Sequence, residues 1–267
     1  MEKRQHFGVR KDAEPQKKFY KPVNRPAKED FVFGYQSVLE TLKSEKEIDK
    51  ILLLKDSKNF VEIEELARKR NIPISKVPLE KLNRVTMKTH QGAIAFVSQV
   101  NFASLSNIVT DVFEKGETPL ILILDRITDV RNFGAICRSA ACSGVHAVVI
   151  PSRNAAQING DAMKTSSGAL NFVPVCREIS LNYAVKYLQN SGFQVFACTE
   201  KGGKSIFDLD YTLPTAIVMG SEEDGISEDI IEMSDQAAFI PMKGPIGSLN
   251  VSVATGIVLF ESLRQRG

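Results

Sequence analysis

The sequence predicts an α/β protein with two folded units, residues 29–100 and residues 119–267, behind a basic N-terminal tail. Short apolar runs alternate with amphipathic stretches along both units, which is typical of strands separated by helices. The run Leu120–Leu124 has no polar alternation, which indicates a strand buried on both faces of a parallel sheet. Glycines and prolines interrupt the chain after several such runs and indicate loops at the strand ends.

Residues 1–28 are predicted to be a disordered basic tail. They hold nine lysines and arginines against three acidic residues, although the whole chain carries a net charge of only +2. Three prolines and a shortage of aliphatic residues leave the segment unable to bury enough apolar surface to fold alone. A flexible basic arm suits a polyanion such as RNA, and a solvated tail without a specific partner is the alternative.

The composition of the whole chain narrows the class of protein. The 267 residues are 43% hydrophobic and 25% charged, as in a soluble globular protein. No apolar run approaches the ~20 residues that span a bilayer, and no secretory signal is visible, so we expect a cytoplasmic protein with no membrane partner. Four cysteines without a CxxC pair and three scattered histidines predict free thiols and no metal site.

The first unit is predicted to be a small α/β domain that begins near Phe31. Val38, Leu39 and Leu42 recur at helical spacing, and a second helix is expected over Val61–Arg70. Strands are expected at residues 51–54, 72–77 and 91–97. The unit has no nucleotide-binding loop and no catalytic cluster. Residues 101–118 are predicted to be a polar linker that is helical around Leu105–Phe113.

The second unit is predicted to be a parallel sheet with helices between its strands. After Leu120–Leu124, further strands are expected at residues 145–150, 194–198, 216–219 and 237–240. Helices are expected at residues 133–142, 181–188 and 251–263. Loops at the carboxyl ends of parallel strands hold the sites of α/β proteins, and three of these loops are unusual.

The first unusual loop leads into the helix that carries Gly134 and Arg138. These residues lie four apart, so they share one face of the helix. Glycine leaves space there, and arginine offers a fixed cation with five donors. Asn132 stands where a helix cap is expected. A capped helix with a surface arginine is the alternative interpretation.

The other two unusual loops follow later strands. In Gly220–Gly225, three acidic residues between glycines indicate either a cation site or an anchor for an arginine. In 239–250, prolines and glycines lead to a helix N-terminus, which Ser248 or Asn250 could cap. Unpaired backbone N–H groups and bare glycine backbone make such a loop a candidate ligand site, and an ordinary turn is the alternative.

Two apparent nucleotide-binding motifs do not match their full patterns. Gly202-Gly-Lys-Ser205 imitates the end of a phosphate-binding loop, but the first glycine of that motif falls on Cys198. The sequence contains no GxGxxG, so a Rossmann dinucleotide site is not supported.

Taken in order, the three loops closely resemble the three motifs of the SpoU/TrmH branch of the SPOUT RNA methyltransferases. Asn132-x-Gly-x-x-x-Arg138 matches the first motif, and Gly220-Ser-Glu222-x-x-Gly225 matches the second. Ile240-Pro-Met242 together with Gly247-Ser248-Leu249-Asn250 matches the third. The resemblance covers about residues 120–265. The first unit resembles the ribosomal-protein-like substrate-binding domain of the 23S ribosomal RNA guanosine 2′-O-methyltransferases of this family.

This resemblance implies a trefoil knot in the second unit, a homodimer that completes each site, and S-adenosylmethionine as the cofactor. The cofactor-binding residues that it implies are Thr199, Gly220, Gly225, Ile240, Met242, Gly247 and Leu249. The catalytic residues that it implies are Asn132, Arg138, Glu222, Ser248 and Asn250.

The implied reaction moves a methyl group to a ribose 2′-hydroxyl of RNA. Because arginine is not deprotonated in proteins, we expect Arg138 to stabilise the developing alkoxide or to hold a neighbouring phosphate. Glu222 is expected to orient Arg138 or to accept the proton through water. Asn132, Ser248 and Asn250 are expected to position the ribose. Large-subunit (23S) ribosomal RNA is the expected substrate; transfer RNA, or a catalytically silent RNA-binding assembly factor, is the alternative.

Overall fold

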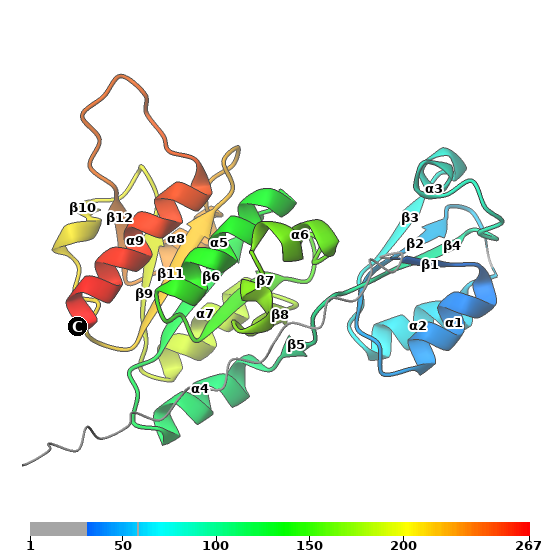
Figure 1. Ribbon diagram of the computed structural model, residues 1–267, viewed down its shortest axis with the longest axis horizontal. Coiled ribbons are helices and arrows are strands. Elements are labelled where there is room, and N and C mark those ends of the chain that lie inside the picture. The colour runs from blue at the N-terminus through cyan, green and yellow to red at the C-terminus, as the bar shows by residue number, and fades with distance from the viewer. Residues whose placement is uncertain (1–30, 58) are drawn as a thin grey trace, which may run out of the picture.

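The computed structural model describes residues 31–57 and 59–267, so the predicted tail lies outside the described residues. The chain forms two units, each built on one β-sheet, and the first unit stands beside one end of the second (Figure 1). This confirms the predicted α/β class. No helix in the described part of the chain is long and apolar enough to cross a membrane.

The first unit has a four-stranded sheet in the order β1-β4-β2-β3. Its strands are β1 (Phe31–Phe33), β2 (Ile48–Leu54), β3 (Ile74–Val77) and β4 (Ala93–Val97). β2 and β3 pair in parallel, and the other two pairs are antiparallel. Helices α1 (Tyr35–Lys43) and α2 (Val61–Lys69) cover one face, where Val38 and Ile63 are fully buried. The short helix α3 (Leu79–Val85) lies on the opposite face (Figure 1).

The second unit has an eight-stranded sheet in the order β10-β12-β9-β11-β6-β7-β8-β5. All of its strand pairs are parallel. Every residue of β6 is buried, which confirms a strand covered on both faces. The strands are β5 (Phe102–Ala103), β6 (Leu120–Asp125), β7 (Ala147–Pro151), β8 (Val175–Glu178), β9 (Gln194–Cys198), β10 (Lys204–Ser205), β11 (Thr215–Gly220) and β12 (Gln236–Phe239).

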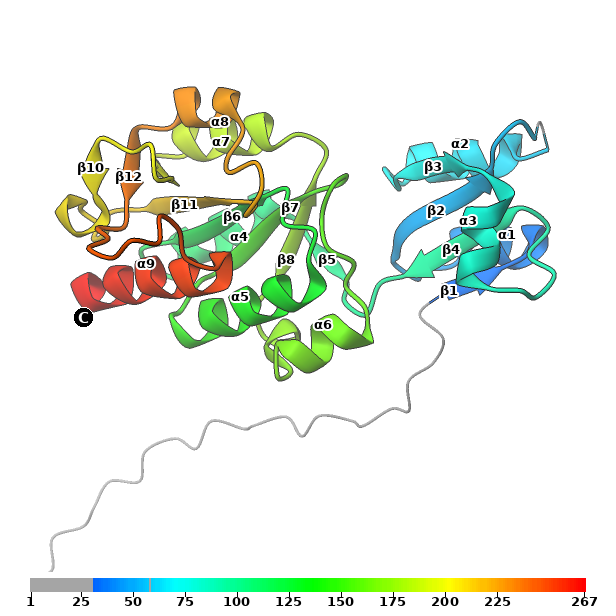
Figure 2. The same ribbon diagram turned by 90° about the horizontal axis from the view of Figure 1, so that it is seen from above.

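Helices cover both faces of this sheet, as Figure 2 shows from above. One face carries α5 (Val130–Cys142), α6 (Gly160–Thr165) and α9 (Val251–Arg266), whose buried side chains share one core with the sheet. The other face carries α4 (Leu105–Glu114), α7 (Leu181–Asn190) and α8 (Glu228–Met233) around a second core. Two short 3₁₀ turns complete the unit at Ala169–Asn171 and Ile206–Asp208.

The structure modifies two expectations about local structure. Helix α5 begins at Val130, three residues earlier than expected, because the side chain of Asp129 caps it by accepting from the backbone N of Asn132 at 2.7 Å. Asn132 is therefore inside the first turn, and its predicted role as the helix cap is wrong. The segment 101–118 contains the predicted helix as α4, and its strand β5 pairs with β8 in the second sheet.

Polar contacts join the two units where the chain passes from one to the other. The half-buried side chain of Asp49 accepts a hydrogen bond from the backbone N of Ile158 at 3.0 Å. Arg177 donates from Nη1 to the carbonyl of Ile48 at 2.9 Å, and its guanidinium lies 4.0 Å from the centroid of the Phe102 ring. These contacts give the first unit a defined attachment to the end of the second sheet.

The connection between β9 and β10 crosses over β12. The backbone N of Thr199 donates to the carbonyl of Ala238, and the backbone N of Gly203 donates to the carbonyl of Ala237. Successive carbonyls of a strand point to opposite sides, so the two ends of this connection lie on opposite sides of β12. A Cβ on Gly202 would stand 2.4 Å from the backbone of Ala238, which shows how closely the chain crosses. A strand beneath such a crossing is compatible with the predicted trefoil knot, which stays a prediction.

Candidate functional site

A cavity of about 750 Å³ lies at the carboxyl ends of β9, β11 and β12. The loops that line it are the second and third unusual loops of the sequence, together with Cys198–Lys201. All seven residues predicted to bind the cofactor line this cavity: Thr199, Gly220, Gly225, Ile240, Met242, Gly247 and Leu249. The structure therefore brings together segments that are up to about fifty residues apart in the chain.

The turn after β11 is tight enough to require glycine at two positions. The backbone N–H and carbonyl groups of Ser221 and Gly225 exchange hydrogen bonds of 3.1 and 3.0 Å. A Cβ on Gly220 would stand 2.1 Å from the carbonyl carbon of Gly225, a distance that no side chain tolerates. Gly225 has a φ of 65°, in the region that favours glycine. Gly220 is therefore needed for the turn to close, and Gly225, where a Cβ would meet nothing within 4 Å, leaves its backbone open beside the cavity.

Glu222 joins the three motifs through one carboxylate oxygen. Its Oε1 accepts hydrogen bonds from Asn250 Nδ2 at 2.5 Å, from the backbone N of Val251 at 3.1 Å and from Asn132 Nδ2 at 3.2 Å. Asn250 Nδ2 also donates to Asn132 Oδ1 at 3.0 Å. Because the segments that follow β6, β11 and β12 each supply one of these side chains, the network holds the three loops in register.

The third loop ends at the N-terminus of α9, and Asn250 is its cap. Asn250 Oδ1 accepts from the backbone N of Ser252 at 3.0 Å and from the Ser252 hydroxyl at 2.5 Å. The Glu222 carboxylate lies at the same helix end, where the helix dipole favours a negative charge. Ser248, the other candidate cap, lines the cavity and forms no hydrogen bond in the described part of the chain.

Arg138 lies apart from this network. It is exposed on α5, and its side chain forms no hydrogen bond or ion pair with any other residue that the structure describes. Within the single chain the Glu222 carboxylate is engaged by Asn132, Asn250 and α9 and does not contact Arg138, so its expected role in orienting Arg138 stays a prediction. The space that Gly134 leaves is filled by α6, since a Cβ there would stand 2.0 Å from Thr165 Oγ1.

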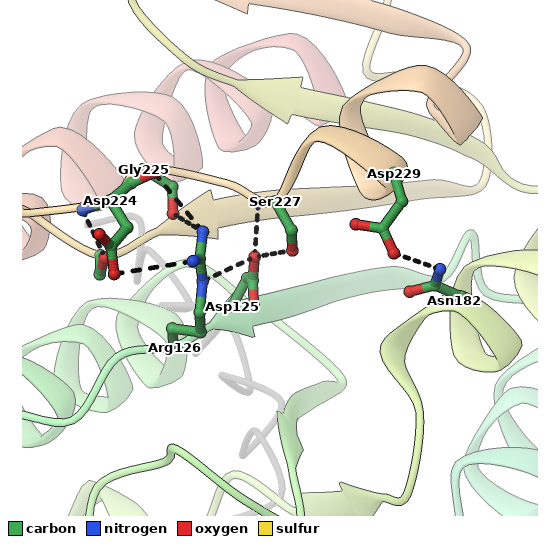
Figure 3. Close-up of polar contacts among 8 residues, drawn as sticks. Asp125, Arg126, Asn182, Asp224, Gly225, Ser227 and Asp229 are labelled. Atoms are coloured by element: carbon green, nitrogen blue, oxygen red, sulfur yellow. Dashed lines mark hydrogen bonds and ion pairs between the residues drawn. The ribbon is translucent and has the colours of Figure 1, made fainter.

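The arginine that the acidic turn anchors is Arg126 (Figure 3). Its Nη2 donates to the carbonyl of Gly225 at 3.2 Å, and its Nη1 lies 3.6 Å from Asp224 Oδ2. Its Nε lies 3.5 Å from Asp125 Oδ2. The same Asp125 oxygen accepts from the backbone N of Ser227 at 2.7 Å and from the Ser227 hydroxyl. Asp125 and Arg126 thus hold the C-terminal end of the turn that carries Glu222.

Sequence reasoning missed this pair. The signal that could have found it is an acidic residue at the end of a fully buried strand followed directly by a basic one. Arg126 also adopts a φ of 58°, which is unusual for a residue other than glycine. Figure 3 further shows Asn182 of α7 bonded to Asp229 of α8, a contact outside the cavity that ties the two helices together.

The charges of the cavity favour a cationic ligand. Four carboxylates line it, against the single ammonium of Lys201: Glu200, Glu222, Glu223 and Asp224. Burial raises the pKa of the Cys198 thiol to about 12, so this thiol stays protonated and is a poor nucleophile. Within residues 31–57 and 59–267, no group of three or more His, Cys, Asp or Glu side chains is placed to hold a metal ion.

Two family models match the chain, one on each unit. Residues 119–260 match the SpoU rRNA Methylase family, and residues 31–103 match the family described as RNA 2′-O ribose methyltransferase substrate binding. The first match covers the whole cavity and the Glu222 network.

Similar proteins agree with these matches. A protein of Bacillus subtilis, named a putative TrmH family tRNA/rRNA methyltransferase, YacO, is 34% identical over 89% of this chain and 96% of its own length. The 23S rRNA (guanosine-2′-O-)-methyltransferase RlmB of Xylella fastidiosa is 35% identical over 90% of this chain and 98% of its own. Among solved structures, the SpoU methyltransferase AviRb of Streptomyces viridochromogenes, in complex with AdoMet, matches with a TM-score of 0.57 and 24% identity. That match covers 88% of this chain and 89% of AviRb, and it shows a shared fold.

Proposed function

The chain belongs to the SpoU rRNA methylase family and is an RNA methyltransferase, and we propose that it methylates a ribose 2′-hydroxyl of large-subunit ribosomal RNA. The methyl donor is S-adenosylmethionine. The observation that carries the proposal is the Glu222 network, because it places three motifs distant in sequence at the rim of one cavity.

The cavity fits this cofactor in size, shape and charge. Its volume of about 750 Å³ lies within the usual range of ligand sites, roughly 300–1,000 Å³. A Cβ on Gly225 or Gly247 would meet nothing within 4 Å, so a planar group can approach the backbone there, and the acidic lining suits a positive charge. When bound, S-adenosylmethionine supplies an electrophilic methyl group on a sulfonium. We assign its binding to the seven predicted residues that line the cavity.

The residues of the chain have distinct tasks in this proposal. Transfer of a methyl group needs the ribose oxygen aligned with the methyl carbon, and fixed loops provide that alignment. Glu222 positions Asn132 and Asn250 and holds the N-terminus of α9, so we regard it as a positioning residue. Ser248, exposed at the rim, is free to contact the ribose. Arg138, whose donors are unused in the described chain, stabilises the negative charge that develops on the ribose oxygen.

We include a homodimer in the proposal. Helix α9 exposes Val253 and Phe260, which lie seven residues apart on one face and are 51% and 50% exposed. Helix α9 packs beside α5, the helix that carries Arg138. A second copy that covers α9 would bury these apolar side chains and would bring its own Arg138 close to the neighbouring cavity.

A mixed dimer tests this arrangement. Chains carrying Arg138→Ala and chains carrying Glu222→Ala are purified together through two different tags. If each site takes Arg138 from the partner, one of the two sites keeps both residues, and about half of the wild-type activity returns. Activity no higher than that of either parent variant would contradict a shared site.

The choice of RNA rests on the first unit and on the relatives. The substrate-binding match at residues 31–103 and the likeness to the Xylella fastidiosa enzyme favour 23S ribosomal RNA. The name of the Bacillus subtilis relative includes transfer RNA, which is the alternative substrate. A silent RNA-binding factor is the alternative function. The predicted cytoplasmic location belongs to the same proposal.

The proposed function is tested by incubating the full chain with tritiated S-adenosylmethionine and separately with 23S ribosomal RNA, 16S ribosomal RNA and total transfer RNA. We expect tritium in the 23S RNA, at least tenfold above the other two. Label in transfer RNA alone would show that transfer RNA, the alternative, is the substrate. Binding of the cofactor with no label in any RNA would favour the silent factor.

A further inference from the structure

The face of the first sheet that carries α3 is only partly covered. Leu82 of α3 packs against Leu52, Val77 and Ile94, which lie on the central and β3 side of the sheet. Towards the β1 edge, the same face presents three phenylalanines that are only partly buried: Phe31, Phe33 and Phe96. Figure 1 shows α1 and α2 on the opposite side of the sheet, so they do not shield these rings.

The three rings and a lysine form a compact row across neighbouring strands. In the strand register, Phe31 lies opposite Phe96, and Lys50 lies opposite Phe96 on the other side. The Phe31 ring centroid is 6.0 Å from that of Phe96 and 6.2 Å from that of Phe33. Such a row presents several aromatic groups within the reach of adjacent bases in an extended strand.

Cations lie directly over these rings. Lys50 Nζ is 5.0 Å from the centroid of the Phe96 ring, and Lys88 Nζ is 5.6 Å from that of Phe33. Burial lowers the pKa of Lys50, the nearby Asp49 carboxylate raises it, and the charge of Lys81 on α3 lowers it, which places a third lysine at the same face. Neither Lys50 nor Lys81 forms an ion pair in the described part of the chain. The face therefore combines partly exposed aromatic rings with three lysines, and among the described residues neither Lys50 nor Lys81 is held in an ion pair.

We propose that this aromatic–lysine face (Phe31, Phe33, Phe96, Lys50, Lys81 and Lys88) binds unpaired nucleotides of the RNA substrate. The inference rests on the proposed function and names the surface that the first unit uses for it. Unpaired bases stack on aromatic side chains, while lysines hold the phosphates between them. A duplex keeps its bases stacked within the helix and would use only the lysines, so the rings favour unpaired RNA.

Charge argues against two other occupants of this face. The basic segment 1–28 joins the chain next to β1, but its excess of lysine and arginine repels the lysines of the face. An apolar protein partner would have to desolvate the ammonium groups of Lys50 and Lys81 without neutralising them, which is unfavourable. A polyanion with flat apolar groups satisfies both the charge and the rings.

Binding of short RNAs to the full chain tests the proposal. Fluorescence anisotropy is measured with a labelled 12-nucleotide oligoadenylate and with a labelled 12-base-pair RNA duplex. In the variant that combines Phe31→Leu with Phe96→Leu, apolar packing is kept and stacking is removed. We expect its affinity for oligoadenylate to fall about tenfold, with duplex binding changed less than twofold. Phe113→Leu, a half-exposed phenylalanine on α4, is the matched control and should change neither.

The contribution of the lysines to RNA binding is measured separately, from its salt dependence. The variant that combines Lys50→Gln with Lys81→Gln should lower the slope of log affinity against log salt for oligoadenylate by about 0.7 for each lysine–phosphate pair that it removes. Lys69→Gln, exposed on α2 behind the sheet, should leave the slope unchanged. In the unaltered chain, bound oligoadenylate should protect Lys50 and Lys88 from an amine-reactive reagent, as read by mass spectrometry. This measurement does not depend on any variant folding.

Failure of this inference differs from failure of the proposed function. If the wild type methylates RNA while the phenylalanine variant binds and methylates like the wild type, the inference is wrong and the function stands. Equal loss of oligoadenylate and duplex binding in the phenylalanine variant would also overturn it, because that pattern indicates general unfolding or a duplex site. If no RNA is methylated at all, the proposed function fails whatever the oligonucleotides do.

Discussion

The two sides of the proposed site are built very differently. On the proposed cofactor side, Glu222, Asn132, Asn250 and the Gly220–Gly225 turn are held by hydrogen bonds from three loops and by the Arg126 contacts behind them. On the proposed acceptor side, the Arg138 side chain is exposed on α5 and has no partner in the described chain. The first set of side chains is held by contacts within a single chain, whereas the Arg138 side chain has no such contacts among the described residues.

Because of this difference, we expect cofactor binding and methyl transfer to depend on different residues. A preorganised loop set can bind a cofactor before any RNA arrives, because its geometry costs nothing further to assemble. An exposed guanidinium acquires its role only when the ribose, its phosphate or a second copy of the chain supplies a partner. Changes on the cofactor side should therefore alter cofactor affinity, whereas changes on the acceptor side should alter turnover alone.

The largest effect is expected for Arg138→Ala. Loss of the cation that stabilises the developing charge should lower kcat roughly 10²–10³-fold, while the Kd for S-adenosylmethionine stays within twofold. Tritium transfer gives kcat, and isothermal titration calorimetry gives the Kd. Arg131→Ala, an exposed arginine on the same helix, is the control. Equal loss of binding and turnover would mean that Arg138 is structural and would remove the contrast between the two sides.

Gly220→Ala should have the next largest effect, now on the cofactor side. The new Cβ would collide with the Gly225 backbone, so the turn must open, at a cost of about 1–3 kcal/mol. We expect cofactor binding to weaken at least tenfold and the melting temperature to fall by several degrees, about 2–4 °C per kcal/mol. Gly244→Ala, where a Cβ meets nothing within 4 Å, should leave both unchanged. Normal cofactor affinity in Gly220→Ala would show that the turn does not form the binding surface.

Glu222→Ala should weaken cofactor binding about five- to tenfold, because three donors lose their shared acceptor while the site remains open to water. Turnover should fall as well, since Asn132 and Asn250 lose their positions. The neighbouring Glu223→Ala removes the same charge from the cavity rim and is the matched control. If calorimetry finds both variants equally impaired, the effect is one of charge and the hydrogen-bond network is unimportant.

The smallest effect is expected for Arg126→Gln, which acts through the turn alone. The contacts of Arg126 are long and partly exposed, so we expect about a threefold rise in the KM for S-adenosylmethionine and little change in kcat. Arg126→Lys keeps the charge but loses the forked geometry, and should fall between the variant and the wild type. A large fall in kcat with an unchanged KM would place Arg126 on the acceptor side instead.

Much of the fold was predictable from local patterns. The unbroken apolar run of β6 identified a doubly covered strand, and β9 begins and ends where its sequence predicts. The apolar run, the prolines and the glycines of this segment predicted a strand, a tight loop and a helix capped by Ser248 or Asn250, and Asn250 is the cap. Such features depend on neighbouring residues, so the sequence displays them directly.

Features that depend on strand order could not be predicted from the sequence. β12 lies between β9 and β10, which precede it in the chain, and only this arrangement explains the close approach at Gly202. The pairing of Arg126 with the acidic turn spans about one hundred residues. Asn132 was mistaken for a cap because Asp129, three residues earlier, has the same capping chemistry. The seven residues predicted to bind the cofactor came from resemblance to a family, and all seven line one cavity.

The most direct test of the account is where the methyl group is found. RNA labelled by the wild type and by Arg138→Ala from tritiated S-adenosylmethionine is digested with alkali, which cleaves only next to a free 2′-hydroxyl. We predict tritium in alkali-resistant dinucleotides from the wild type and almost none from Arg138→Ala, although both chains bind the cofactor equally. Tritium in single nucleotides, as from a methylated base, or equal labelling by both chains, would contradict the account.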